Sequence, residues 1–191
     1  RSTVTGTIGQ LDAAVDMPEL TAPELGDSAG EVEYKGGKHA ISADLHCAKL
    51  TLCRGAVVDI EGDVTMLVDG KLTVKDRSAI RVQPESTLTL YVGGSMAVVR
   101  GASINMDPAD PQRVSVFMLA GGEDDDDHKI TLDRGGRMAA WVQGAETFLR
   151  IDDRSEFFGA FLGRSVKVED HSRFHVDMAA GSGGGVIVYE P

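Results

Sequence analysis

Apolar residues recur with a fixed period through the middle of the chain. From Asp63 to Ala102 the sequence divides into consecutive units of eight residues, with apolar residues at the second and fourth positions of each unit. This alternation places one side of a short strand inward, whereas spacings of two and then six do not form a helical stripe. The predicted inward residues are Val64, Met66, Leu72, Val74, Ile80, Val82, Leu88, Leu90, Met96 and Val98, with Ile104 and Met106 continuing the phase.

Two all-β architectures fit units of this length. In an antiparallel meander each unit is a hairpin arm, and a sandwich results. In a solenoid, two or three units form one coil of roughly 16 to 24 residues, and coils stack at roughly the 4.8 Å strand spacing. Asp69-Gly70 suits a two-residue hairpin turn, but Asp76–Ser78, Pro84–Ser86 and Arg100–Ala102 do not. The constant phase over consecutive units favours the solenoid.

The periodic region has interruptions and flanks. Residues 107–112 and 123–128 break the phase, and the pattern returns after each of them. A final apolar run, Val186–Tyr189, follows a glycine-rich stretch and is expected to cover the end of the stack. Residues 1–30 contain Pro18 and Pro23 and show no period, which predicts an extended leader or linker. The predicted organisation is therefore a leader over residues 1–30 and a β-solenoid domain over residues 31–191.

Composition narrows the possible partners. The chain has 191 residues, of which 42% are hydrophobic and 26% charged, which suits one domain with its own core. The net charge is −11 and no basic stripe with interleaved aromatic residues is visible, so we expect neither nucleic acid nor an anionic membrane surface as a partner. No apolar run approaches the roughly 18 residues that a membrane span needs. The chain opens at Arg1 without a signal peptide, which we interpret as a mature or trimmed fragment.

Two cysteines, Cys47 and Cys53, lie six residues apart. A local disulfide between them would suit an exported protein, and two separate buried thiols would suit the cytoplasm. Their spacing matches no common zinc-binding pattern, because a second pair of ligands is missing. The sequence leaves the disulfide open.

The acidic run from Glu123 to His128 is the strongest candidate for a metal site. The carboxylates of Asp124, Asp125, Asp126 and Asp127 are hard oxygen ligands of the kind that Ca²⁺ prefers. The run lacks the alternating spacing that wraps a chain around the ion, and adjacent side chains diverge. A solvated acidic loop therefore explains it better, and we predict no cofactor other than this Ca²⁺ alternative.

No residues converge clearly on a catalytic arrangement. Asp59, Asp63, Asp69 and Asp76 are spread over turns, and a turn also explains the Asp152–Arg154 cluster. His171 and His175 lie near Asp170 and Asp177, but we expect His175 to form a hydrogen bond at a coil corner, with Phe174, Val176 and Met178 inward. Polysaccharide-cleaving enzymes need several acidic residues that meet in one groove. The sequence therefore predicts no catalytic residue, and the protein is not expected to be an enzyme.

Several segments in order resemble a known but uncharacterised domain. These are the runs Asp63–Val74 and Ser86–Gly94, the strand Glu156–Gly163, the segment Ser172–Asp177 and the end Val186–Glu190. Together they resemble a bacterial β-solenoid domain that accompanies pilus-assembly (PilX-like) and secretion-pathway proteins. Val176 and Tyr189 depart from the Tyr and Trp usual there. The resemblance implies a single-stranded, right-handed parallel β-helix (β-solenoid) with short strands and an extended N-terminal arm.

The expected function follows from the pattern and the resemblance. We predict a non-catalytic structural or interaction module of an exported pilus-like or cell-envelope assembly, periplasmic or at the cell surface, with protein partners. Open strand edges also allow a second hypothesis, a filament subunit that stacks through its solenoid ends. A third hypothesis is a carbohydrate-binding or carbohydrate-cleaving β-helix. The aromatic residues concentrated in the second half, if exposed, would supply a partner surface.

Overall fold

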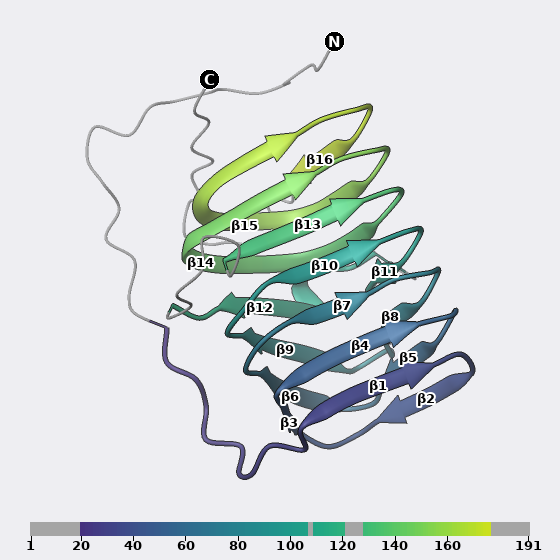
Figure 1. The fold of residues 1–191 in the computed structure, drawn as a ribbon, viewed down its shortest axis with the longest axis vertical. Helices are drawn as coiled ribbons and strands as arrows, with labels where there is room; N and C mark the ends of the chain where they lie inside the picture. Colours follow the sequence, from purple (N-terminus) through teal and green to yellow (C-terminus); the bar gives the residue numbers. More distant parts are fainter. Residues whose placement is uncertain (1–19, 107–108, 121–127, 177–191) are drawn as a thin grey trace.

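The chain forms a parallel β-solenoid. The structure is a computed structural model that describes residues 20–106, 109–120 and 128–176. Its strands belong to one sheet in which all pairings between strands are parallel, as in β4 with β7 and β6 with β9. In Figure 1 the strands of the near side run from left to right, the chain returns along the far side, and successive coils climb, so the coil is right-handed. The predicted fold class is confirmed, and the antiparallel meander is excluded.

Each regular coil contributes one strand to each of three faces. Face A contains β1 (Glu31–Lys35), β4 (Lys49–Cys53), β7 (Leu72–Val74), β10 (Met96–Val99) and β13 (Lys129–Asp133). Face B contains β2 (Lys38–Ile41), β5 (Val57–Ile60), β8 (Ala79–Val82), β11 (Ser103–Ile104) and β16 (Arg173–Val176). Face C contains β3 (Leu45–Cys47), β6 (Asp63–Val68), β9 (Thr87–Val92) and β12 (Val114–Met118).

The strand register explains the eight-residue units. Leu72 pairs with Met96 on face A, and Val64 pairs with Leu88 on face C, in each case 24 positions along the chain. Three units therefore complete one coil. All the predicted inward residues from Val64 to Val98, and Ile104, are buried in one continuous core, while Met106 is half-buried. Alternation identified these core residues because inward side chains from every face meet at the solenoid axis, although it did not mark Val68 and Val92, which are also buried.

The coils after the first interruption differ in length. A short 3₁₀ helix, η1 (Pro111–Arg113), follows Asp110, whose side chain accepts a hydrogen bond from the backbone N–H of Gln112 at 3.2 Å. Met96 and its partner Ile130 are 34 positions apart, so the fourth coil carries the extra residues. The next two coils are short, since Leu149 follows its partner Ile130 by 19 positions and precedes Val166 by 17.

The short coils contain two long strands, β14 (Arg137–Ile151) and β15 (Glu156–Val168). Each continues from face B through face C to face A, with one register shift between Gly144 and Phe148. These two strands are longer than predicted, because strand pairing between β14 and β15 continues across the corners between the faces.

The two ends of the described stack are less buried than its middle. Val32 and Tyr34 in the first coil and Phe174 in the last are only partly buried, and Val176 is 44% exposed. At the first coil, part of the predicted leader lies against β3, where Ala29 donates its backbone N–H to His46 and Ala48 donates to Gly30, each at 2.9 Å. Residues 1–19 and the predicted closing strand 186–189 lie outside the described residues.

Candidate functional site

The corner between faces A and B repeats one turn in all seven described coils. In each turn the two central residues have positive φ, from Gly36 and Gly37 in the first coil to Asp170 and His171 in the last. From the second coil on, the fourth residue of each turn donates its backbone N–H to the carbonyl of the first, as Ser78 does to Lys75 at 3.2 Å. This is the geometry of a primed β-turn. The turns after the first are Cys53–Ala56, Lys75–Ser78, Val99–Ala102, Asp133–Gly136, Asp152–Ser155 and Glu169–Ser172.

Hydrogen bonds between coils hold these turns in a ladder. Gly55 donates its backbone N–H to Asp76, Arg77 donates to Arg100, and Gly101 donates to Arg134, at 2.9 to 3.0 Å. The fourth residue of most turns is small and buried, and the Ser78 hydroxyl accepts a further bond from the backbone N–H of Ala56 at 3.1 Å. The Asp76-Arg77 and Arg100-Gly101 pairs therefore form two-residue turns, which the sequence did not suggest. These turns connect two faces of one coil and not the two strands of a hairpin.

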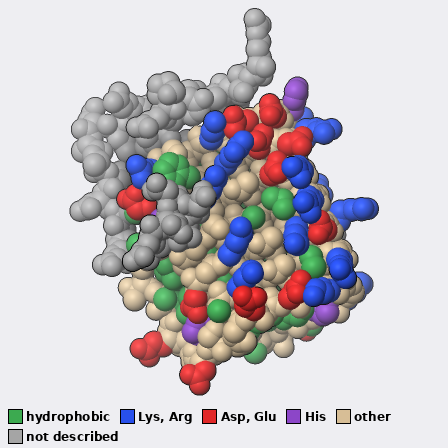
Figure 2. Space-filling model, viewed as in Figure 1, with side chains coloured by type: hydrophobic (Ala, Val, Ile, Leu, Met, Phe, Trp, Pro, Cys, Tyr) green, Lys and Arg blue, Asp and Glu red, His purple; other side chains and the backbone are tan. Residues whose placement is uncertain are grey.

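The outer side of this corner carries a basic ridge, defined as Arg54, Arg77, Arg100, Arg134 and Arg154. These five arginines occupy central turn positions in five successive coils, and all are exposed. Figure 2 shows Lys and Arg side chains gathered along the right-hand edge, where this corner lies in Figure 1, with acidic side chains between them. The ridge is visible only in the structure, because stacking brings to one corner arginines that lie 20 to 34 positions apart in the sequence.

Three arginines of the basic ridge form ion pairs with neighbouring carboxylates. Arg100 Nη1 lies 3.2 Å from Asp76, Arg134 Nε 3.5 Å from Asp133, and Arg154 Nε 3.4 Å from Asp153. Each contact uses one guanidinium nitrogen, and surface pairs of this kind contribute little to stability. Within the described ranges, Arg54 and Arg77 form no ion pair. Most of the hydrogen-bonding capacity of the ridge therefore faces solvent.

A shallow hollow at the C-terminal end of the ridge is lined by Asp153, Arg154, Asp170 and His171. Next to it, the backbone N–H of Asp153 and then the Arg150 guanidinium lower the pKa of Asp152. The sequence analysis interpreted the Asp152–Arg154 cluster as a turn, and the positive φ of Asp153 and Arg154 confirms this interpretation. The hollow brings one histidine and two carboxylates to the surface, but they remain open to water.

The two histidines near the C-terminal end are on different elements. His171 occupies the last described turn, whereas His175 lies within β16 and stacks on Phe158 with ring centroids 4.3 Å apart and planes 7° apart. The prediction that His175 forms a hydrogen bond at a corner is wrong, because its outward position in the strand places it over the outward ring of the previous coil. Phe174 faces inward as predicted and stacks on Phe157 at 5.0 Å. Asp177 and Met178 lie outside the described residues.

The other acidic residues singled out by the sequence have separate partners. Asp59 binds Arg81 at 2.8 Å, and Asp63 accepts the Thr87 hydroxyl at 2.7 Å. Asp69 contacts His46 at 2.9 Å, and Asp76 pairs with Arg100. In the described part of the chain no three His, Cys, Asp or Glu side chains are placed to share a metal ion. Asp124, Asp125, Asp126 and Asp127, the Ca²⁺ candidates, lie outside the described residues.

His46 joins the leader to two coils. Its Nδ1 lies 2.6 Å from the carbonyl oxygen of Gly26, and its Nε2 lies 2.9 Å from Asp69. The backbone contact to Gly26, and then the Asp69 carboxylate, raise the pKa of His46. Both ring nitrogens face acceptors, so the doubly protonated imidazolium satisfies both contacts as a donor.

Both cysteines are free and buried. Burial, and then the nearby Asp69 carboxylate, raise the pKa of the Cys47 thiol to about 11. The Cys53 thiol donates to Glu33 at 3.5 Å, and Glu33 itself has a lowered pKa, chiefly because Lys35 binds it. The structure therefore holds the second of the two arrangements left open by the sequence, with separate buried thiols.

Face C carries aromatic residues on its outer side. Tyr91 stacks on Phe117 with centroids 5.0 Å apart, and Phe117 meets Trp141 edge to face at 5.7 Å. Phe157 and Phe161 are buried in the core, whereas Tyr91, Phe117 and Trp141 lie in outward register and are half-buried. Phe148 is 37% exposed, with the Arg164 guanidinium 5.0 Å from its ring.

Comparison with known proteins assigns the family. A family model described as a domain of unknown function, DUF7305, matches residues 4–181. The chain belongs to the DUF7305 family. The matched residues include the whole of the described solenoid, so in this chain the family's domain is a parallel β-solenoid. No curated protein and no solved structure matches the chain. Among the described residues, no helix has the length and apolar character that a membrane crossing needs.

Proposed function

We propose that this DUF7305 domain is a non-catalytic structural and interaction module of an exported pilus-like or cell-envelope assembly. The observation that carries the proposal is the regularity of the outer surface. Each coil repeats the same turn at the same corner, and each inward side chain joins one apolar core. A stack of this kind presents the same ordered faces from coil to coil, which suits a spacer or a binding surface.

Two further features support an interaction role over catalysis. The aromatic residues on the outer side of face C and the basic ridge on the A–B corner give two different surfaces that run along the stack. The hollow at the C-terminal end of the ridge is shallow. Its two acidic residues, Asp153 and Asp170, lie there because they are central residues of two stacked turns. The pilus and envelope setting rests on the resemblance noted in the sequence, to which the family description adds no activity.

The test uses the full-length protein in its own cells. Intact cells are treated with protease, and surface filaments are sheared off and separated from cell bodies before the protein is detected in each fraction. Digestion on intact cells together with recovery in the sheared fraction supports the proposal. Complete protection from protease in intact and osmotically shocked cells refutes export. An Asp153→Asn, His171→Gln variant provides the control for catalysis, and loss of its cellular role with unchanged location would favour an enzyme.

The filament hypothesis has one observation in its favour. The first and last described coils leave apolar inward residues partly exposed, with Tyr34 at one end and Phe174 and Val176 at the other. Exposed strand edges with apolar neighbours pair readily with other chains. Mass measurements over a concentration range, with negative-stain images, test this function. A series of growing oligomers supports stacking, and a monomer at all concentrations refutes it.

A further inference from the structure

We infer that the basic ridge binds an extended acidic polysaccharide, a chain of sugars that carry carboxylates. The inference rests on the proposed interaction role and names the ligand class for it. It follows from three properties of the ridge: the backbone strain at its arginines, the free donors of its guanidinium groups, and its spacing along the stack.

The A–B turns keep side chains at strained backbone positions, five of them arginines and the others Asp76, Asp153, Asp170 and His171. Nine of the eleven described non-glycine residues with positive φ lie in the A–B turns, and all five ridge arginines are among them. The left-handed conformation is costly for residues that have a Cβ, and glycine avoids this cost. The first coil makes the same corner with Gly36 and Gly37, so the turn itself does not require arginine. Strain of this kind concentrates at functional positions.

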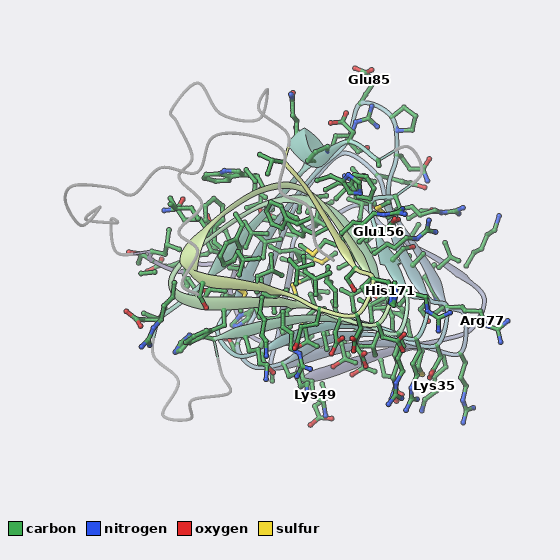
Figure 3. The ribbon with its side chains drawn as sticks, turned by 90° about the horizontal axis from the view of Figure 1, so that it is seen from above. Lys35, Lys49, Arg77, Glu85, Glu156 and His171 are labelled. Atoms are coloured by element: carbon green, nitrogen blue, oxygen red, sulfur yellow. The ribbon has the colours of Figure 1, made fainter. Side chains whose placement is uncertain are left out.

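The guanidinium groups are available to a ligand. The side chains of Arg100, Arg134 and Arg154 are 55%, 62% and 80% exposed, and each ion pair occupies one nitrogen. In Figure 3, which looks down the stack, Arg77 and Lys35 point away from the molecule on the same side. Guanidinium groups bind carboxylates with two parallel hydrogen bonds, and arginine keeps its charge at any physiological pH.

The spacing of the ridge selects a linear ligand. Because the turns stack through backbone hydrogen bonds, successive turns repeat at about the strand spacing of 4.8 Å, with arginine at the first central position in Arg54, Arg100 and Arg134 and at the second in Arg77 and Arg154. A sugar unit in an extended glycan has a comparable length, so one carboxylate per sugar can follow one guanidinium per coil. The N-terminal half of the corner is the most basic part, because Lys35, Lys38 and Lys75 flank Arg54, Arg77 and Arg100 there.

Other polyanions fit the ridge less well. Duplex DNA carries one charge per roughly 1.7 Å and presents a broad surface. The ridge offers one arginine per coil, or one charge per about 4.8 Å, so its charge spacing does not match that of a duplex. Binding of a single-stranded nucleic acid is an alternative that the experiment must distinguish from binding of a polysaccharide.

The experiment measures binding of the full chain to polygalacturonate, with uncharged dextran and an oligothymidylate as comparison ligands, at several salt concentrations. The ridge variant combines Arg54→Gly, Arg77→Gly and Arg100→Gly. A matched control removes three positive charges elsewhere through Lys49→Gln, Lys71→Gln and Arg164→Gln. A second ridge variant with Asn at the same three positions keeps a side chain, because Asn tolerates left-handed backbone.

The expected result is polygalacturonate binding that weakens with salt and does not occur with dextran. The Gly variant should lose about tenfold or more in affinity, because three guanidinium contacts are removed. Its melting temperature should stay equal or rise, since glycine relieves strain, and the matched control should bind nearly as the original chain does.

Three results would overturn the inference: no binding by the original chain, oligothymidylate binding at least as tightly, or equal losses in the ridge and control variants. Unfolding of both ridge variants would assign the arginines a structural role and would also overturn it. If polygalacturonate does not bind, the proposed function as an exported module still stands. If the protein is cytoplasmic, that proposed function is refuted, but the measured affinity is unchanged.

Discussion

At the scale of single residues, His46 is the group whose protonation matters most for the described leader. It is the only side chain of this region placed between the Gly26 carbonyl and the Asp69 carboxylate, which join the leader, the first coil and the second coil. Hydrogen bonds to both ring nitrogens favour the charged imidazolium and raise its pKa.

The sign of the pH effect follows from the raised pKa. Protonation strengthens this contact, so its contribution to stability is fully present below the ordinary histidine pKa of about 6.5 and is lost as the pH rises through the higher folded value. We expect the His46 ring protons to titrate above about 6.5 in an NMR titration. The Asp69→Asn variant should titrate lower than the original chain. A midpoint at or below the ordinary value in the original chain would contradict the contact.

Cys47 offers a second test at this scale. With a pKa of about 11, only about one thiol in a thousand is ionised at pH 8, and the side chain is fully buried. Iodoacetamide should therefore leave Cys47 unmodified in the folded protein. In denaturant without reductant both cysteines should react, as mass spectrometry can show. Labelling in denaturant only after reduction would mean that Cys47 and Cys53 form a disulfide, contrary to the structure.

At the scale of elements, the turn ladder decides which residues each corner accepts. Gly135 and Gly136 are neighbours in the fifth turn with different constraints. Gly135 has φ 75° and free space where a Cβ would lie, with the Gly101 Cα as its nearest neighbour at 4.0 Å. A Cβ on Gly136 would overlap the carbonyl oxygen of Val98 on β10.

This difference gives a prediction for a matched pair of variants. Gly135→Ala should lower the free energy of unfolding by about 1 kcal/mol, because only the left-handed backbone opposes it. Gly136→Ala should cost about 2 to 3 kcal/mol, because the backbone of two coils must move apart. Urea unfolding at equilibrium measures both values. A larger cost for Gly135→Ala than for Gly136→Ala would mean that backbone conformation, and not packing between coils, controls this corner.

The strands were easier to predict than the corners. Alternation identified Val64, Leu72 and Ile80 as core residues because side-chain direction along a strand is a local property. The left-handed turns at Asp76-Arg77 were not predicted, because the hydrogen bonds that hold them come from the next coil, at Arg100. The sequence did contain a signal for these turns. Pairs drawn from Arg, Asp and Gly recur directly before a small residue, as in Arg54–Ala56 and Arg100–Ala102.

The basic ridge was missed for the same physical reason. Its arginines are separated by a whole coil in sequence, and the differing coil lengths hide their spacing. Knowledge of the register is needed before Arg77 and Arg134 can be placed on one line. The length of β14 likewise became visible only with the register, since its pairing with β15 runs through all three faces.

At the scale of the whole molecule, the stack is a one-dimensional assembly in which each coil contacts its two neighbours. Leu72 lies between Leu50 and Met96, and Ile80 lies between Val58 and Ile104. Stability in such a protein is a sum over coils and their interfaces, and no residue contact has to join coils that are not neighbours. Removal of a complete coil should therefore be tolerated when it restores the register.

Deletion of residues 72–95 tests this property, because it removes β7, β8 and β9 and joins Lys71 to Met96. The register then lets β4 pair with β10 and β5 with β11, and the turn at Cys53–Ala56 stacks directly on Val99–Ala102. We expect one cooperative thermal transition by circular dichroism, at a lower temperature than in the original chain, because one coil interface is lost.

Deletion of residues 72–79 is the matched control, since it removes one eight-residue unit and preserves the inward alternation. It should abolish the cooperative transition, because that coil would have two faces and its turn could not stack on the A–B ladder. Equal behaviour of the two deletions would show that alternation alone specifies the fold. A cooperative transition in the longer deletion only would show that the stacked turns fix the three-sided coil, and with it the corner along which the arginines lie.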